Sequence, residues 1–181
     1  MRLTSLIQAP FTAALALLGG TMVIVGQPAH DAKLQAQLKK VFPAATAFSG
    51  KEGDPPHFNA YQQDAKTGQQ SLAGFAFWTT ELDPLERGYD GPIKMLVGMD
   101  VKGILTGVLV VEHHEPYGSF SVEPPEFAAQ FKGKSIRDPF RVGDDVDAVS
   151  RASITITSAT RSIKNSARRV ARQLLTPPAS K

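Results

Sequence analysis

Residues 93–112 read Ile-Lys-Met-Leu-Val-Gly-Met-Asp-Val-Lys-Gly-Ile-Leu-Thr-Gly-Val-Leu-Val-Val-Glu. Two runs rich in Val, Ile, Leu and Met, residues 93–100 and 104–112, flank the short segment 101–103, in which Gly103 suits a turn. The pattern predicts a β-hairpin. This hairpin decides the fold class, because strands joined by a short turn pair in the antiparallel sense.

A second hairpin is predicted N-terminal to the first. Residues 57–63 and 71–79 form its strands, and Lys66-Thr67-Gly68 supplies its turn. Residues 31–41 are expected to form a short helix before it, which ends ahead of Pro43. The apolar positions at helical spacing in that segment are Leu34, Leu38 and Val41.

Two further helices are predicted C-terminal to the hairpins, at residues 124–131 and 159–175, with strand or loop over 146–157. The closing helix is basic and amphipathic, and Pro177-Pro178 stops it. Its core stripe is Ile163, Ala167, Val170 and Leu174. Hairpins followed by helices indicate an α+β fold, with an antiparallel sheet, short helices and this C-terminal helix.

The N-terminal segment is expected to target the protein. Residues 11–26 are uninterruptedly apolar or small, and Arg2 is the only charge before His30. We therefore assign residues 1–30 to a signal peptide or an N-terminal membrane anchor, either of which places the following residues on the periplasmic side of the cytoplasmic membrane. Residues 31–176 are expected to form one domain, followed by a tail over 177–181.

The amino-acid composition excludes several kinds of catalytic and metal site. The chain has no cysteine, which excludes thiolate catalysis and Cys-ligated zinc or iron–sulfur sites within it. The last 21 residues carry six Lys/Arg and no acidic residue, so a basic helix facing anionic lipid is one reading and a solvated face is another. Nucleic acid is not an expected partner, because the helix lacks interleaved aromatic residues.

Residues 147–155 read Asp-Ala-Val-Ser-Arg-Ala-Ser-Ile-Thr and carry the chemistry. A phosphoester needs an uncrowded aliphatic hydroxyl, and Ala152 leaves room around Ser153. Asp147 is suited to accept a proton, and Arg151 to neutralise a phosphate. A helix beginning near Ser158 would direct its free N–H groups toward such an anion. An ordinary polar strand-and-cap region is the alternative for this segment.

The segment resembles the Asp-x-x-Ser/Thr-Gly-Ala-Thr/Ser-x-Thr signature of the FMN-binding domain family. In that family a flavin transferase esterifies the hydroxyl after the Ala with the phosphate of FMN, which implies Ser153 as the attachment point here. Residues 88–100, 110–116 and 161–168 carry further likenesses, so the chain most resembles the periplasmic N-terminal domain of NosR/NirI-type proteins over residues 34–174. Those flavoproteins serve nitrous oxide and nitrite respiration.

The resemblance implies an exported flavoprotein that carries electrons with FMN and is a redox carrier more than a turnover enzyme. Its implied partners are a flavin transferase, membrane electron-transfer proteins or a periplasmic reductase, and the membrane itself. The attachment loop would comprise Asp147, Ser150, Arg151, Ala152, Ser153 and Thr155. The expected ring and ribityl contacts are Tyr89, Asp90, Gly91, Pro92, His113, Glu115 and Gly118.

Three departures leave other functions open. Ser153 stands where the family more often has Thr, and residues 113–118 keep only part of a His-x-Glu-Thr-Pro-Gly segment. Arg151, where the wider family has Gly, is instead a further likeness to the NosR/NirI-type proteins. NosR/NirI-type proteins also continue into membrane spans and cysteine clusters, so we expect separate electron partners. A flavin-free sensory or assembly module for a membrane respiratory complex is the alternative. A metal site at His113-His114-Glu115 is disfavoured, because adjacent strand residues point to opposite faces.

Overall fold

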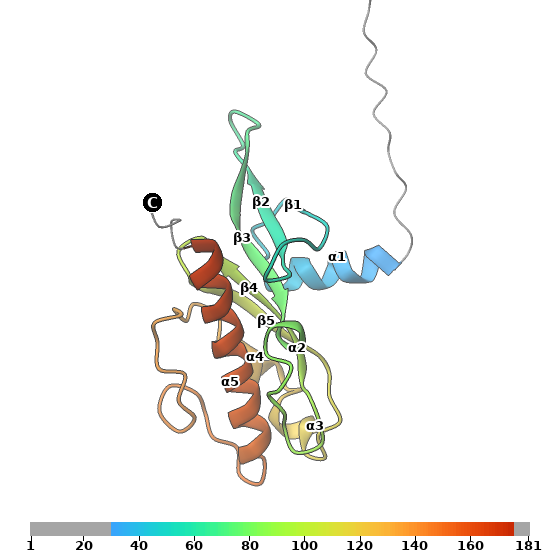
Figure 1. Ribbon diagram of the computed structural model, residues 1–181, viewed down its shortest axis with the longest axis vertical. Coiled ribbons are helices and arrows are strands. Elements are labelled where there is room, and N and C mark those ends of the chain that lie inside the picture. The colour runs from blue at the N-terminus through green and yellow to red at the C-terminus, as the bar shows by residue number, and fades with distance from the viewer. Residues whose placement is uncertain (1–29, 176–181) are drawn as a thin grey trace, which may run out of the picture.

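The computed structural model describes residues 30–175, of which residues 30 and 31 are described by their backbone alone. Most of the predicted leader or anchor, and the predicted tail over 177–181, lie outside these residues. The fold is the predicted α+β class (Figure 1). The elements are α1 (His30–Val41), β1 (Ala47–Phe48), β2 (Phe58–Gln63), β3 (Gln70–Trp78), α2 (Thr79–Leu82), β4 (Lys94–Asp100), β5 (Leu105–Glu112), α3 (Gly118–Ser121), α4 (Pro125–Ala129), α5 (Ser153–Val170) and a π-helical turn, η1 (Ala171–Leu175).

The five strands form one antiparallel sheet in the order β1-β2-β3-β4-β5. Both predicted hairpins are confirmed, β2–β3 and β4–β5, and they pair with each other through β3 and β4. The β2–β3 hairpin extends beyond the body of the molecule (Figure 1). Within the part of the chain that the structure describes, no helix has the length and apolar character needed to span a membrane.

Helices cover both faces of the sheet. Met95, Val97 and Met99 on β4 pack in the larger core with α5, whereas Leu96 points to the opposite face, where α1 lies. The alternation follows from the two-residue period of a strand. The predicted α1 stripe is present, because Leu38 and Val41 are fully buried in this second core and Leu34 packs against it.

Two glycines let α1 approach the sheet. A Cβ on Gly98 would lie 2.4 Å from the carbonyl oxygen of Val41, and a Cβ on Gly107 would lie 2.9 Å from the same atom. The Thr106 hydroxyl donates a hydrogen bond to that carbonyl at 2.6 Å. The end of α1 is therefore fixed on β4 and β5 by close backbone contact that a side chain would prevent.

The closing helix begins at Ser153, so the expectation of strand or loop up to residue 157 and a helix from 159 is wrong. The β-branched run Ile154-Thr155-Ile156-Thr157 favours a strand by intrinsic propensity. Packing overrides it, because Ile156 continues the buried stripe of α5. The fully buried members of that stripe are Ile156, Ala159, Ile163, Ala167 and Val170.

The basic side chains of α5 are largely engaged within the protein. Arg168 donates from Nε to the carbonyl of Ile136 at 2.8 Å and from Nη2 to that of Asp138 at 2.9 Å. Lys164 bonds to the carbonyl of Pro139, and Arg169 to that of Leu82. These side chains hold the long segment before α5 and the end of α2 against the helix. The basic face of α5 is therefore more than a solvated surface, which was one of the two expectations from the sequence.

Candidate functional site

Glu115 joins two of the segments singled out in the sequence. It lies just beyond the end of β5 and is 6% exposed. Its carboxylate accepts hydrogen bonds from the backbone N–H of Tyr89 at 2.9 Å and of Asp90 at 3.0 Å. The hydroxyl of Thr155, in the first turn of α5, donates to the same carboxylate. One side chain thus ties the 88–92 loop to the start of the closing helix.

These contacts set the ionisation of Glu115. Burial by itself raises the pKa of the carboxyl, but the hydrogen bonds from Thr155, Tyr89 and Asp90, with a smaller effect of the charge on His113, outweigh it. The pKa therefore lies below its ordinary value near 4.5. A carboxylate that accepts several N–H and O–H bonds stays ionised, because each bond favours the charged form.

Two glycines allow this close packing. A Cβ on Gly88 would lie 2.3 Å from Oε1 of Glu115, and a Cβ on Gly118 would lie 2.0 Å from Cε1 of His113. Gly88 also donates its N–H to the carbonyl of Gly91 at 2.7 Å, which closes the loop, and Gly91 has a φ of 124°. Pro92, which follows, is exposed.

His113 supports the same arrangement from the other side. Its Nδ1 accepts the backbone N–H of Glu115 at 3.1 Å, and its Nε2 lies 3.1 Å from Oε1 of Glu123. His114 is exposed. Residues 30–175 contain no group of three or more His, Cys, Asp and Glu residues positioned to hold a metal ion. His113 acts in this structure as a hydrogen-bonded support for Glu115.

The proposed attachment residue, Ser153, is the first residue of α5 and is exposed. It lines a pocket of about 280 Å³. The other lining residues are Glu86, Arg87, Ile154, Thr157, Ser158 and Arg161. Residues 153, 157 and 161 are spaced by one helical turn, so the hydroxyl and the Arg161 guanidinium share one face of the helix.

The other residues of the 147–155 segment do not all face the pocket that Ser153 lines. Asp147 and Ser150 are exposed, and the backbone N–H of Asp147 donates to Oε1 of Gln130 at 2.7 Å. Arg151 has a φ of 68°, a conformation in which glycine is unstrained, and Ala152 is 2% exposed. Thr155 is turned inward to Glu115, so Ser153 and Thr155 point to different surroundings.

Several site residues were missed from the sequence. Arg87 and Arg161, from distant segments, line the pocket with Ser153, although the sequence suggested Arg151 for the phosphate. Two large apolar side chains near this helix end were also missed, the exposed Leu85 (90%) and Ile154 (58%); Tyr89, which is 71% exposed, was among the expected contacts. The short helix α3, which carries the exposed Phe120, packs against α5 near the same end (Figure 1). The sequence around a single apolar residue does not show whether its side chain will be exposed or buried in the fold.

The chain matches known proteins over the segments that build this site. The FMN-binding domain model matches residues 88–168, which include the 88–92 loop, Glu115 and the first turns of α5. Residues 88–168 therefore match the FMN-binding domain, as the motifs implied, and this match indicates FMN as the cofactor.

Among curated relatives, the regulatory protein NosR of Stutzerimonas stutzeri is 27% identical over 76% of this chain and 19% of its own length. NosR of Pseudomonas aeruginosa is 26% identical over 83% of this chain and 22% of its own length. One component of the ion-translocating oxidoreductase complex of Yersinia pestis is 31% identical over 57% of this chain and 52% of its own length. The chain thus spans about a fifth of the NosR proteins.

The residues present fit FMN. Ser153 offers an accessible hydroxyl, and Arg87 and Arg161 line the same pocket. Nη1 of Arg161 lies 3.4 Å from both carboxylate oxygens of Glu86, so a phosphate there would take over part of this pairing. The first turn of an 18-residue helix adds free N–H groups. The exposed side chains of Tyr89 and Ile154 would offer apolar surface to a flavin ring.

Proposed function

We propose that FMN is bound covalently through a phosphoester to Ser153 and that the chain carries electrons with it. The observation that supports this most directly is the position of Ser153: exposed, first in α5, and in one pocket with Arg87 and Arg161. The net change is one FMN added and one water lost, with the new bond between Oγ of Ser153 and phosphorus. When bound, FMN supplies one- and two-electron redox chemistry.

The protein's own groups have separate tasks in this proposal. Arg87 and Arg161 balance the phosphate charge, and the N–H groups at the start of α5 contact its oxygens. Tyr89 and Ile154 cover the ring. Glu115 keeps the 88–92 loop at a fixed distance from α5 through its bonds to Tyr89, Asp90 and Thr155. Asp147, Ser150 and Arg151 shape the loop that precedes Ser153.

The relatives suggest the setting. One group is named for a regulatory protein, NosR, and the other for a component of an ion-translocating oxidoreductase complex. We infer that residues 1–30 export or anchor the chain, that a flavin transferase matures it, and that it works at the periplasmic side of the membrane. Its electron partners would be membrane proteins or a periplasmic reductase in a nitrous oxide or nitrite pathway.

Site-specific replacement tests the attachment. Ser153→Ala is expected to abolish flavin fluorescence of the denatured protein on a gel, whereas Ser150→Ala, an exposed hydroxyl in the same segment, is expected to retain it. Ser153→Thr should also retain it, because the hydroxyl is preserved. Covalent fluorescence in the Ser153→Ala protein would refute the assignment, and a wild-type protein that binds no flavin would favour the sensory or assembly module.

A further inference from the structure

Within residues 30–175, no strand pairs with the outer edge of β5 along most of its length. β5 is the last strand of the sheet. Its first residue is bonded on the outer side, since Leu105 donates to the carbonyl of Lys134 and accepts from the N–H of Gly133, both at 2.8 Å. Among the residues that the structure describes, Thr106 to Glu112 make no backbone bond beyond those within the sheet. An open apolar edge of this kind pairs readily with another chain.

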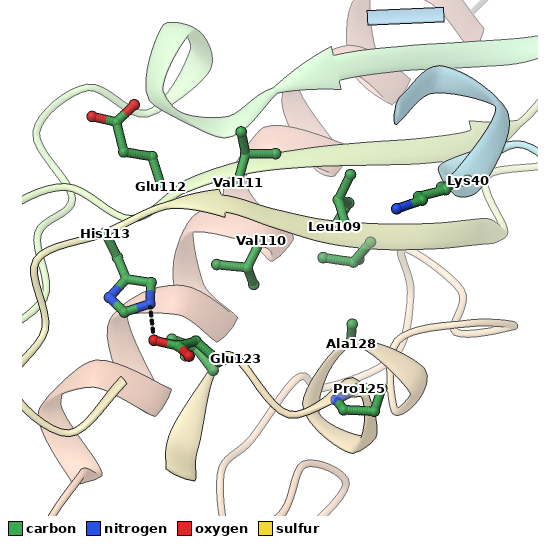
Figure 2. Close-up of a pocket in the computed structure, with 11 residues that line it drawn as sticks. Lys40, Leu109, Val110, Val111, Glu112, His113, Glu123, Pro125 and Ala128 are labelled. Atoms are coloured by element: carbon green, nitrogen blue, oxygen red, sulfur yellow. Dashed lines mark ion pairs between the residues drawn. The ribbon is translucent and has the colours of Figure 1, made fainter. Parts of the chain in front are cut away.

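A groove of about 710 Å³ follows this edge. Six consecutive residues, 108–113, line it, so side chains from both faces of the strand contribute and the groove runs along the strand itself (Figure 2). At about 3.3 Å per residue these six span roughly 20 Å. That length suits five or six residues of an extended chain.

The groove has a wall on each side. Lys40, at the end of α1, lies on one side, and Glu123, Pro125 and Ala128 from the α3–α4 segment lie on the other (Figure 2). Val122 also lines the groove. A single extended chain fits between such walls. The β5 edge of a second copy would bring its own α4 wall to the same face of the sheet, where it would meet the first, so a second copy is disfavoured.

Charge gives the groove a direction. Lys40 lies at one end, and Glu112 lies at the other, beside Glu123 and its 3.1 Å contact with Nε2 of His113 (Figure 2). The middle is apolar, formed by Val108, Leu109, Val110 and Val111. An occupant with a basic residue beside Glu112, apolar residues in the centre and an acidic residue toward Lys40 would match it.

We propose that this groove binds an extended segment of a partner protein, added to the sheet as a sixth strand beside β5. Main-chain bonds to the β5 edge supply affinity, and the valine side chains with the two charged ends supply specificity. The bound segment would end beside His113, which contacts the backbone of Glu115. The partner would therefore be held next to the loop that Glu115 fixes.

A peptide taken from this chain provides a defined probe. β4 reads Lys-Met-Leu-Val-Gly-Met-Asp and already pairs antiparallel with β5, with Lys94 opposite Glu112. A peptide of this sequence, blocked at both ends, carries the proposed charge order when it runs antiparallel along the outer edge. It would be titrated into the ¹⁵N-labelled full chain, with binding followed by amide shifts and by anisotropy of a fluorescent label.

The expected result is shift changes confined to residues 106–113 and 122–128. Glu112→Lys should weaken binding by about threefold to tenfold, as reversal of an exposed charge pair does. Glu126→Lys makes the same charge change on an exposed α4 residue outside the groove and should leave binding unchanged. Ala128→Arg, which fills the groove from its wall, should abolish it.

Three outcomes would overturn the proposal. The first is no binding up to about 1 mM peptide. The second is binding that maps to another part of the sheet or that Glu112→Lys and Glu126→Lys weaken equally. The third is concentration-dependent dimerisation of the chain through β5 in sedimentation, which would assign the groove to a second copy. None of these readouts depends on bound flavin, so the result is independent of the attachment at Ser153.

Discussion

At the scale of single residues, Arg151 shows how the loop before α5 is built. Its φ of 68° lies in the left-handed region, which costs a side-chain-bearing residue on the order of 1 kcal/mol. The family signature that this segment resembles has Gly at this position, which is free of that cost. The strained turn delivers Ala152 to the core and Ser153 to the surface at the first residue of the helix.

Replacing Arg151 with Gly should relieve this strain. We expect Arg151→Gly to change the free energy of unfolding by less than about 0.5 kcal/mol, because relief of about 1 kcal/mol of strain offsets the roughly 0.4–1 kcal/mol of entropy that glycine gains in the unfolded chain. Urea denaturation would measure it. Ser150→Gly is the matched control, since Ser150 is not among the positive-φ residues and should lose stability. A larger loss of stability in Arg151→Gly would show that the side chain has a compensating role.

Glu115 makes stability depend on pH. Its folded-state pKa lies below the ordinary value near 4.5, so its contribution is fully present above pH 4.5 and is lost as the pH falls through the folded-state pKa. Glu115→Gln should lower the free energy of unfolding by about 1–3 kcal/mol at pH 7, because buried N–H groups lose a charged acceptor. The free energy of unfolding of the variant should also fall less steeply than that of the wild type as the pH drops below 4.5. Urea unfolding measured at a series of acidic pH values would show this. The same dependence on pH in both proteins would contradict this account.

At the scale of elements, the hairpins were predictable and the short helices were not. Alternating apolar runs around Lys66-Thr67-Gly68 and Val101-Lys102-Gly103 are local signals, and β2–β3 and β4–β5 follow them closely. The four-residue helices α2 and α3 and the two-residue strand β1 depend on contacts distant in sequence. The start of α5 was missed for the same reason, since packing of Ile156 outweighs the strand propensity of its neighbours.

The seating of α1 gives a test at this scale. In Gly98→Ala the new methyl group would lie 2.4 Å from both the carbonyl oxygen of Val41 and Oγ1 of Thr106. We expect a loss of about 1–3 kcal/mol in the free energy of unfolding, because α1 must lift from β4. Gly50→Ala, with no atom within 4 Å of the added Cβ, is the control. Equal stability of the two variants would show that this contact is not tight.

At the scale of the whole molecule, the site forms where three segments separated in sequence meet. The 88–92 loop, the end of β5 and the start of α5 were each recognisable from their residues, and Glu115 brings them together. Arg87 and Ile154 were not recognisable, because their place in one pocket with Ser153 results from packing of α2 against α5. The sequence motifs were enough to predict the cofactor, whereas the residues that surround it could be found only from the three-dimensional structure.

The central claim is that Ser153 carries FMN, and intact mass tests it most directly. The full chain would be co-expressed with a flavin transferase, weighed, and digested to locate any modification. The account predicts a mass gain of one FMN less one water, on the peptide that contains Ser153. An unmodified mass in a protein that still binds flavin, or the same gain on a different hydroxyl, would contradict it.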